Sequence, residues 1–364
     1  MEKGNIRHMF PGGNTSKGFF SYYSYILPQE NARKIFILKG GPGVGKSTFM
    51  KKSGLELAER GFDIEFMHCS SDNSSLDGIV VPKLGIAMID GTAPHVVDPK
   101  NPGAVDEIIH LGDYWKEEGL RANKDGILKD NKEVGRLFAR AYRYINAAAS
   151  VYDDSAVING WAMNMAKLNL AAAKLIDTFF GSDAIAEKEG NERKLFASAF
   201  TPNGMQNHLD TILIGKICAI KGGAGTGTDS LLEKIKTAAV ERGFYIEAYY
   251  CPLNPEKLEH LVIPGKGISF TTVNKYHKVG KEAFVEIDLN EYLEKALLQR
   301  YDDVIDYNEK IFEDLLQRGL DTIALAKVLH DHMETYYIPN MDFDAVQRCW
   351  ESTMARILEY AGEV

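Results

Sequence analysis

The chain has 364 residues, about twice the length of a typical domain of roughly 100 to 200 residues, so two domains are expected. Hydrophobic residues make up 45% and charged residues 26%, which excludes disordered, collagen-like and coiled-coil proteins. The net charge of -9 disfavours nucleic acid as a partner, because an acidic surface repels phosphodiester backbones.

Membrane insertion and secretion are also disfavoured by the sequence. No uninterrupted apolar run reaches 18 residues, and residues 1–15 lack the apolar core of a leader peptide. The four cysteines occur in no paired or metal-ligating spacing, and such sparse thiols are typical of a reducing compartment. The sequence therefore predicts a cytoplasmic protein without a membrane partner.

A repeat with an offset of 182 residues organises the chain. Residues 34–95 align with residues 216–277 without a gap, and 21 of the 62 aligned positions are identical. Upstream, the segment that starts at Arg7 corresponds loosely to the segment that starts at Arg193. A repeat of this length indicates a duplicated domain, since solenoid repeats are much shorter. We therefore divide the chain in the charged segment 182–191, into a first copy of residues 1–188 and a second copy of residues 189–364.

Each copy predicts the same succession of elements. A short apolar strand at 35–38 or 217–220 leads into a glycine-rich turn, and the helix that follows ends at Gly61 or Gly243. A second strand at 63–68 or 245–250, a short helix, and a third strand at 86–89 or 268–271 come next. This alternation predicts an α/β fold with a mainly parallel sheet flanked by helices. The remainder of each copy, 131–180 or 301–361, has helical periodicity and predicts a helical hairpin.

The turn of the first copy matches the phosphate-loop pattern G-x-x-x-x-G-K-[ST], with an apolar strand before it and an amphipathic helix after it. Glycines let successive backbone N–H groups point at one anion, and the helix start adds its positive dipole. Lys46 is expected to contact the β- and γ-phosphates, and the Ser47 hydroxyl to bind Mg²⁺. The predicted nucleotide-binding residues are Gly40, Gly41, Gly43, Val44, Gly45, Lys46, Ser47 and Thr48.

On these residues the first copy resembles the P-loop NTPases, and its loop is similar to that of nucleotide kinases and small ATPases. The whole chain resembles a bacterial ATPase-like family with two tandem P-loop domains, the second degenerate. The resemblance implies a carboxylate at the end of a nearby strand that holds Mg²⁺ through water. Asp90, which follows the apolar run 86–89, fits that place. Asp72 and Asp77 are competing acids beyond the second strand, where an acid often binds the phosphate acceptor or the catalytic water.

The residues after Asp90 leave the reaction open. AAA and RecA-like ATPases usually place a glutamate there to polarise water, whereas this chain has Gly91. The segment Asp90–Pro94 is closer to the Asp-Gly-x-Pro turn of adenylate-kinase-like enzymes, with His95 where their arginine is expected. His95 recurs as His277 in the second copy, which favours a structural role for it.

Phosphoryl transfer usually needs an additional cation to stabilise the charge of the transition state. Arg136, Arg140 and Arg143 share one face of a predicted helix and are candidates for a lid, although a solvated or salt-bridged face is the simpler interpretation. The other candidates are Arg121 in the first copy and Lys221, Arg300 and Arg318 in the second.

The corresponding loop of the second copy, residues 222–230, keeps every glycine of the turn but loses the chemical groups. Thr228, Asp229 and Thr272 stand in the places of Lys46, Ser47 and Asp90. A carboxylate at the loop would repel phosphate. We therefore expect that the second copy does not bind Mg-ATP productively and that the two copies pack as an intramolecular pseudo-dimer.

Three functions remain compatible with the sequence. The first is Mg²⁺-dependent ATP hydrolysis in the N-terminal half, with Lys46, Asp90 and Asp72 as the catalytic residues. The second is a kinase that transfers the γ-phosphoryl group to a nucleotide or small metabolite. The third is a nucleotide-sensing interaction protein with negligible turnover. ATP is preferred over GTP only by prevalence, since no Asn-Lys-x-Asp motif for guanine occurs.

Overall fold

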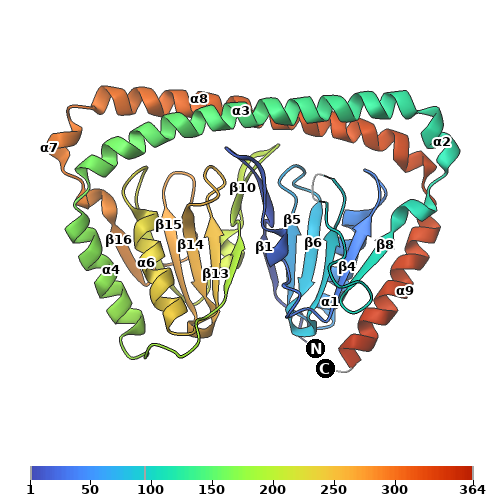
Figure 1. The fold of residues 1–364 in the computed structure, drawn as a ribbon, viewed down its shortest axis with the longest axis horizontal. Helices are drawn as coiled ribbons and strands as arrows, with labels where there is room; N and C mark the ends of the chain where they lie inside the picture. The colour runs from blue at the N-terminus through green and yellow to red at the C-terminus, as the bar shows by residue number, and fades with distance from the viewer. Residues whose placement is uncertain (1, 94–95, 363–364) are drawn as a thin grey trace.

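A computed structural model describes residues 2–93 and 96–362. Two lobes, each built on a six-stranded sheet, lie side by side beneath a pair of long helices (Figure 1). The prediction of an α/β fold in two sheet-bearing halves is therefore confirmed.

The two large sheets have the same strand order. In the first it is β1 (Ile6–Met9), β5 (Ile64–His68), β6 (Leu76–Val81), β7 (Ile86–Asp90), β4 (Lys34–Lys39) and β8 (Asp106–His110). In the second it is β9 (Glu192–Leu195), β13 (Ile246–Tyr250), β14 (Leu258–Ile263), β15 (Ile268–Val273), β12 (Lys216–Lys221) and β16 (Val285–Asp288). The helices that follow the glycine-rich turns, α1 (Lys46–Glu59) and α6 (Thr228–Glu241), end before Gly61 and Gly243 as predicted.

The short helix predicted between the second and third strands is wrong, because β6 and β14 occupy that place. Both strands are fully buried and run antiparallel to their two neighbours, so the sheets are mixed, with parallel pairs in the majority. In the second copy the Asn254 side chain accepts a hydrogen bond from the backbone of Glu256 at 3.2 Å. This is a local Asx turn, which resembles a helix N-cap in sequence but starts a hairpin here.

A small antiparallel sheet joins the two lobes at the centre of the molecule. Its order is β11 (Gly204–Asn207), β10 (Ser198–Thr201), β2 (Gly12–Thr15) and β3 (Gly18–Ser21). Phe10 and Phe196 each donate a backbone hydrogen bond of 2.9 Å to the other, across the two halves. The two halves therefore pair through their backbones at this point.

The helical regions do not form the predicted hairpins within each copy. Instead α3 (Lys124–Ala162) and α8 (Asp302–Tyr337) lie side by side and span both lobes (Figure 1). A helix of 39 residues is roughly 58 Å long, which is enough to carry the chain across the molecule. At the crossing, Gly319 of α8 allows close approach, since an added Cβ would lie 2.8 Å from Ile145 of α3.

As a consequence, the last helix of each copy packs on the lobe of the other copy. Helix α4 (Met165–Phe180) packs on α6 of the second lobe, and α9 (Phe343–Gly362) contributes Trp350 and Met354 to the core of the first lobe. Backbone bridges fix both crossings: Met163 pairs with Leu293, and Met341 pairs with Trp115. The division at residue 188 lies between α4 and β9, but each packed lobe contains chain from both sides of it.

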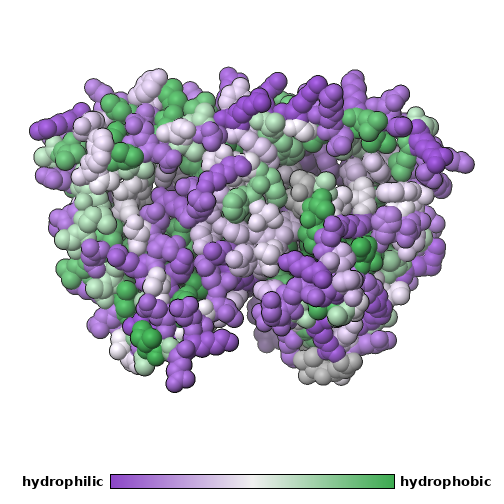
Figure 2. Space-filling view, viewed as in Figure 1, coloured by the Kyte–Doolittle hydropathy of each residue, from purple (hydrophilic) through white to green (hydrophobic). Residues whose placement is uncertain are grey.

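The shorter elements complete the connections. They are α2 (Glu117–Ala122), α5 (Leu209–Ile212), α7 (Lys295–Leu298) and the 3-10 turns Tyr23–Tyr25, Pro82–Leu84, Leu111–Tyr114, Pro264–Lys266, Leu289–Tyr292 and Ile338–Asn340. Among the described residues, no helix is both long and apolar enough to cross a bilayer. Polar side chains cover much of the visible face, and the lower edge is notched between the lobes (Figure 2).

A cluster of four charged residues, three of them buried and Arg7 partly exposed, lies between the two large sheets. Arg7 of β1 bonds Glu247 of β13 at 3.0 Å, and Arg193 of β9 bonds Glu65 of β5 at 2.7 and 3.0 Å. Arg7 also contacts Glu65 at 3.2 Å. Burial alone would raise the pKa of Glu247, but hydrogen bonding and the charge of Arg7 outweigh burial and lower it. Glu247 is thus held ionised by Arg7 of the other half, and Glu65 is bonded by Arg193.

Arg193→Leu is expected to destabilise the fold by about 3 to 5 kcal/mol, because it leaves Glu65 buried without its bidentate partner. Arg136→Leu is the matched control, since Arg136 forms only an exposed pair with Glu133, and it should cost less than about 1 kcal/mol. Urea unfolding followed by circular dichroism measures both. Equal effects of the two substitutions would contradict the importance of the buried cluster.

A truncated chain that ends at residue 188 should be insoluble or aggregated. It lacks α9, so the apolar residues that contact Trp350, Met354 and Ile357 become exposed, and its own α4 has no second sheet to cover. Size-exclusion chromatography of the soluble fraction, beside the full chain, provides the measurement. A soluble, monomeric and compact first half would show that the exchanged helices are dispensable.

Candidate functional site

The first glycine-rich loop, residues 40–45, joins strand β4, the neighbour of the edge strand β8, to the start of α1. Strand β4 lies between β7 and β8, and both pairings are parallel, so the loop emerges at the edge where all three strands end. Gly43 and Gly45 have φ values of 67° and 96°, a backbone region that favours glycine. The loop thus has the local conformation that the glycine spacing predicts, at the carboxyl edge of the sheet.

Lys46 folds back over this loop. Its Nζ atom donates hydrogen bonds to the backbone oxygens of Gly40 at 3.0 Å and Gly41 at 2.8 Å, and lies 3.7 Å from Oδ2 of Asp90. Only 10% of the Lys46 side chain is exposed. The ammonium group is therefore held at the loop, with its charge balanced by two carbonyls and one carboxylate.

Asp90 ends β7 and lies beside the loop. Its Oδ1 accepts a hydrogen bond of 2.8 Å from the backbone of Thr92, and the Thr92 hydroxyl donates to the Gly40 carbonyl at 3.0 Å. The Ser47 hydroxyl accepts a bond of 2.9 Å from the backbone N–H of Leu76. The predicted metal ligands thus supply a hydroxyl and a carboxylate, and such oxygen donors are the type that Mg²⁺ prefers.

The other predicted loop residues differ in exposure. The Val44 side chain is buried in the first core, whereas Thr48 is exposed on the first turn of α1. Asp77 is 3% exposed in β6, at the position where the register with β5 shifts. Pro94 and His95 lie outside the described residues.

Asp72 lies in the turn before β6 and contacts the other half of the chain. It accepts hydrogen bonds of 2.8 Å from the hydroxyls of Ser74 and Ser75, and lies 3.5 Å from Nζ of Lys327 on α8. Burial would raise the pKa of Asp72, but these hydrogen bonds and the Lys327 charge outweigh it and lower the pKa. Asp72 is therefore engaged in a turn and in an ion pair between the halves.

The C-terminal end of α8 covers the first loop. A Cβ added to Gly41 would lie 2.5 Å from the ring of Tyr337, and one added to Gly43 would lie 3.0 Å from Ile338 and 3.1 Å from Glu334. Only glycines leave room for this contact. Sequence reasoning missed these α8 residues, because nothing in a helical periodicity tells which lobe the end of the helix reaches.

None of the arginines considered as candidates has a described hydrogen bond or ion pair with the first loop. Arg136, Arg140 and Arg143 line a shallow hollow on α3, and Arg136 bonds Glu133 at 2.9 Å. Arg121 pairs with Glu117 on α2, and Lys221 pairs with Glu286 in the second half. The simpler interpretation, a salt-bridged surface, fits Arg136 and Arg121. Lys327 of the second copy instead contacts Asp72, in the turn before β6.

The second loop keeps the backbone conformation. Gly225 and Gly227 have φ values of 70° and 78°, similar to their counterparts in the first loop. Helix α3 covers this loop, and the Asn159 side chain donates a hydrogen bond of 2.8 Å to the Ala224 carbonyl. Each loop is thus covered by the long helix of the other copy.

A cavity of about 230 Å³ adjoins the second loop. Polar residues of the loop, of the neighbouring strands and of α3 line it, and these include Gly222, Thr228, Asn146, Asp153, Lys257 and Glu259. Thr228 and Thr272 are buried where the first copy has Lys46 and Asp90. The cavity therefore lacks counterparts of Lys46 and Asp90.

Comparisons of this chain with family models, with curated proteins and with solved structures find no match.

Proposed function

We propose that the first half binds a nucleoside triphosphate, with ATP favoured, together with Mg²⁺ and hydrolyses it, while the second half does not. The observation that carries this proposal is the arrangement of Lys46 beside Asp90 on a glycine-rich loop between β4 and α1. Backbone N–H groups at a helix start, a lysine and a strand-end carboxylate are a combination suited to phosphate and Mg²⁺. The second loop lacks the lysine and the carboxylate, so it supports only the fold of the pair.

Each residue has a distinct role in the proposed reaction. The ammonium of Lys46 would exchange its two carbonyl partners for phosphate oxygens, which it binds more strongly because they are charged. The Ser47 hydroxyl and the Asp90 carboxylate would hold Mg²⁺, which neutralises charge on the β- and γ-phosphates. Asp72, with its lowered pKa, is ionised at neutral pH, and it would exchange one of its bonds to Ser75 or Lys327 to orient the attacking water.

Nucleotide binding is proposed to move α8. Tyr337, Ile338 and Glu334 fill the space above Gly41 and Gly43, so entry of phosphates beside these glycines displaces the end of α8. Because α8 runs back across the second lobe, the displacement is transmitted to the interface between the halves. Binding of nucleotide to the first half would in this way change the contacts between the two halves.

Nucleotide sensing with very slow turnover is the second candidate function. Gly91 follows Asp90, and a Cβ there would lie 2.5 Å from the Ile37 side chain and 3.0 Å from the Val97 carbonyl. The site therefore has no room for the glutamate that polarises water in many ATPases. This restriction favours retention of bound nucleotide over rapid hydrolysis, whereas transfer to an acceptor has no comparable support.

Lys46→Ala should abolish phosphate release from Mg-ATP and weaken nucleotide binding at least about tenfold, since it removes the only lysine of the loop. Thr228→Ala, at the same position of the second loop, is the matched control and should leave both unchanged. The measurement is free phosphate and ADP after incubation with Mg-ATP, with binding followed by calorimetry.

The outcomes separate the candidates. Phosphate release above the Lys46→Ala background supports hydrolysis, and tight binding without release supports sensing. Binding that persists unchanged in Lys46→Ala but falls in Thr228→Ala would overturn the assignment of the nucleotide to the first half.

A further inference from the structure

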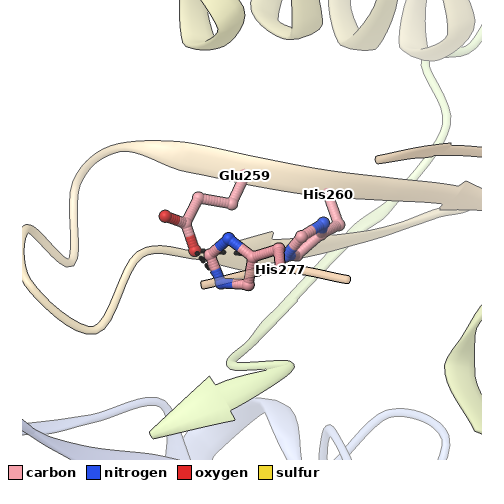
Figure 3. A group of neighbouring side chains, drawn as sticks. All are labelled: Glu259, His260 and His277. Carbon is pink, nitrogen blue, oxygen red and sulfur yellow. Dashed lines mark ion pairs between the residues drawn. The ribbon is translucent and has the colours of Figure 1, made fainter. Parts of the chain in front are cut away.

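Three potential metal ligands meet in the second sheet, away from the first loop. Glu259 and His260 belong to β14, and His277 lies in the connection after β15 (Figure 3). The His277 ring lies between the Glu259 carboxylate and the His260 ring in this view. All three residues offer a ligand atom within 4.8 Å of the others.

A register shift in the sheet makes this arrangement possible. Tyr249 of β13 pairs with His260, whereas Tyr250 pairs with Leu258, so Glu259 has no partner across the strand. Consecutive side chains of a regular strand point to opposite faces, but an extra residue at a bulge redirects one of them. Glu259 and His260 can therefore both face His277.

The distances suit one small ion. The Glu259 Oε2 atom lies 3.4 Å from Nε2 of His277 and 3.9 Å from Nε2 of His260. Ligand bonds of about 2.0 to 2.2 Å in a tetrahedral zinc site separate the ligand atoms by roughly 3.3 to 3.6 Å. The separation from His277 lies in this range, and the separation from His260 exceeds it by a few tenths of an ångström.

The three groups are buried, and two of the proposed ligand atoms have no hydrogen-bond partner among the described residues. His260 is 0%, His277 2% and Glu259 9% exposed. Within the described part of the chain, neither Glu259 Oε2 nor His260 Nε2 has a hydrogen-bond partner. Buried polar atoms of this kind are normally satisfied, and a bound cation would satisfy both at once.

A neighbouring hydroxyl orients the His260 ring. Thr271 Oγ1 lies 2.7 Å from His260 Nδ1 and has the Thr272 carbonyl as a further partner at 3.4 Å. If the hydroxyl donates to that carbonyl, it accepts the Nδ1 proton of His260, which leaves the lone pair of Nε2 directed at the cluster. Such outer hydrogen bonds commonly position histidine ligands of metals.

We propose that Glu259, His260 and His277 bind one divalent transition-metal ion of the zinc type. One carboxylate and two neutral imidazoles are a suitable donor set for Zn²⁺, and they leave a fourth position for water or another ligand. The Ser198 hydroxyl, 3.3 Å from His277 Nε2, also lies beside the cluster.

The site is specific to the second copy. Asp77 and Gly78 stand in the first copy where Glu259 and His260 stand in the second, so the first copy lacks one imidazole. Glu259 also lines the cavity beside the second loop. The second copy, whose loop has no lysine, therefore carries the proposed metal ligands next to that loop.

The test is metal binding by the full chain after treatment with a chelator. Titration with Zn²⁺ in a calorimeter, and with Co²⁺ followed by visible absorption, should give one site per chain. Glu259→Gln and His277→Gln should abolish the Co²⁺ spectrum. His330→Gln is the matched control, because His330 belongs to the other potential ligand group, with Asp331 and Glu334, and it should leave the spectrum unchanged.

If Glu259→Gln or His277→Gln unfolds the protein, a substitution of Thr271, which is not itself a ligand, still tests the proposal. Thr271→Val retains the side-chain volume and should weaken Zn²⁺ binding about 10- to 100-fold by releasing the His260 ring, whereas Thr271→Ser should restore it. Circular dichroism of each variant establishes folding. Absence of saturable binding to the wild-type chain, or a Co²⁺ spectrum lost in His330→Gln but kept in Glu259→Gln, would overturn the proposal.

Discussion

The buried charge cluster between the two large sheets sets the arrangement of the molecule. Arg7 and Arg193 project from the edge strands β1 and β9, and each is bonded to a glutamate of the other half. Buried charges are costly unless they are paired, so the four residues are satisfied only when the halves meet in this register. The central small sheet and the crossing of α3 over α8 follow from that register. Both long helices then end above the opposite lobe.

Much of the fold is readable from the sequence because the duplication repeats every local signal. The strands at 35–38 and 86–89, the glycine-rich loops and the helix ends at Gly61 and Gly243 all depend on nearby residues. The antiparallel strands β6 and β14 are not predicted, since the turn at Asn254 before β14 resembles a helix start. The exchange of α4 and α9 was also missed, because an amphipathic face indicates that a helix is buried but does not say against which sheet.

In the candidate site, too, the features set by nearby residues can be predicted from the sequence, whereas the contacts between the two copies cannot. Gly43 and Gly45 have positive φ values, as a tight glycine-rich turn requires, and Asp90 lies 3.7 Å from Lys46, whereas its role in binding Mg²⁺ stays a prediction. The contacts of Tyr337 with Gly41 and of Lys327 with Asp72 cross between the copies, and no local pattern encodes them. The two copies thus share one architecture, with the phosphate chemistry proposed in one and a metal site proposed in the other.

The central claim is that the first loop and the end of α8 respond together to nucleotide. Hydrogen–deuterium exchange of the full chain, with and without Mg-ATP, tests it directly. Mg-ATP should slow exchange in residues 40–48 and speed exchange in residues 330–345, and neither change should occur in the Lys46→Ala variant. Protection confined to residues 222–230, or protection of the first loop without any change at the end of α8, would contradict it.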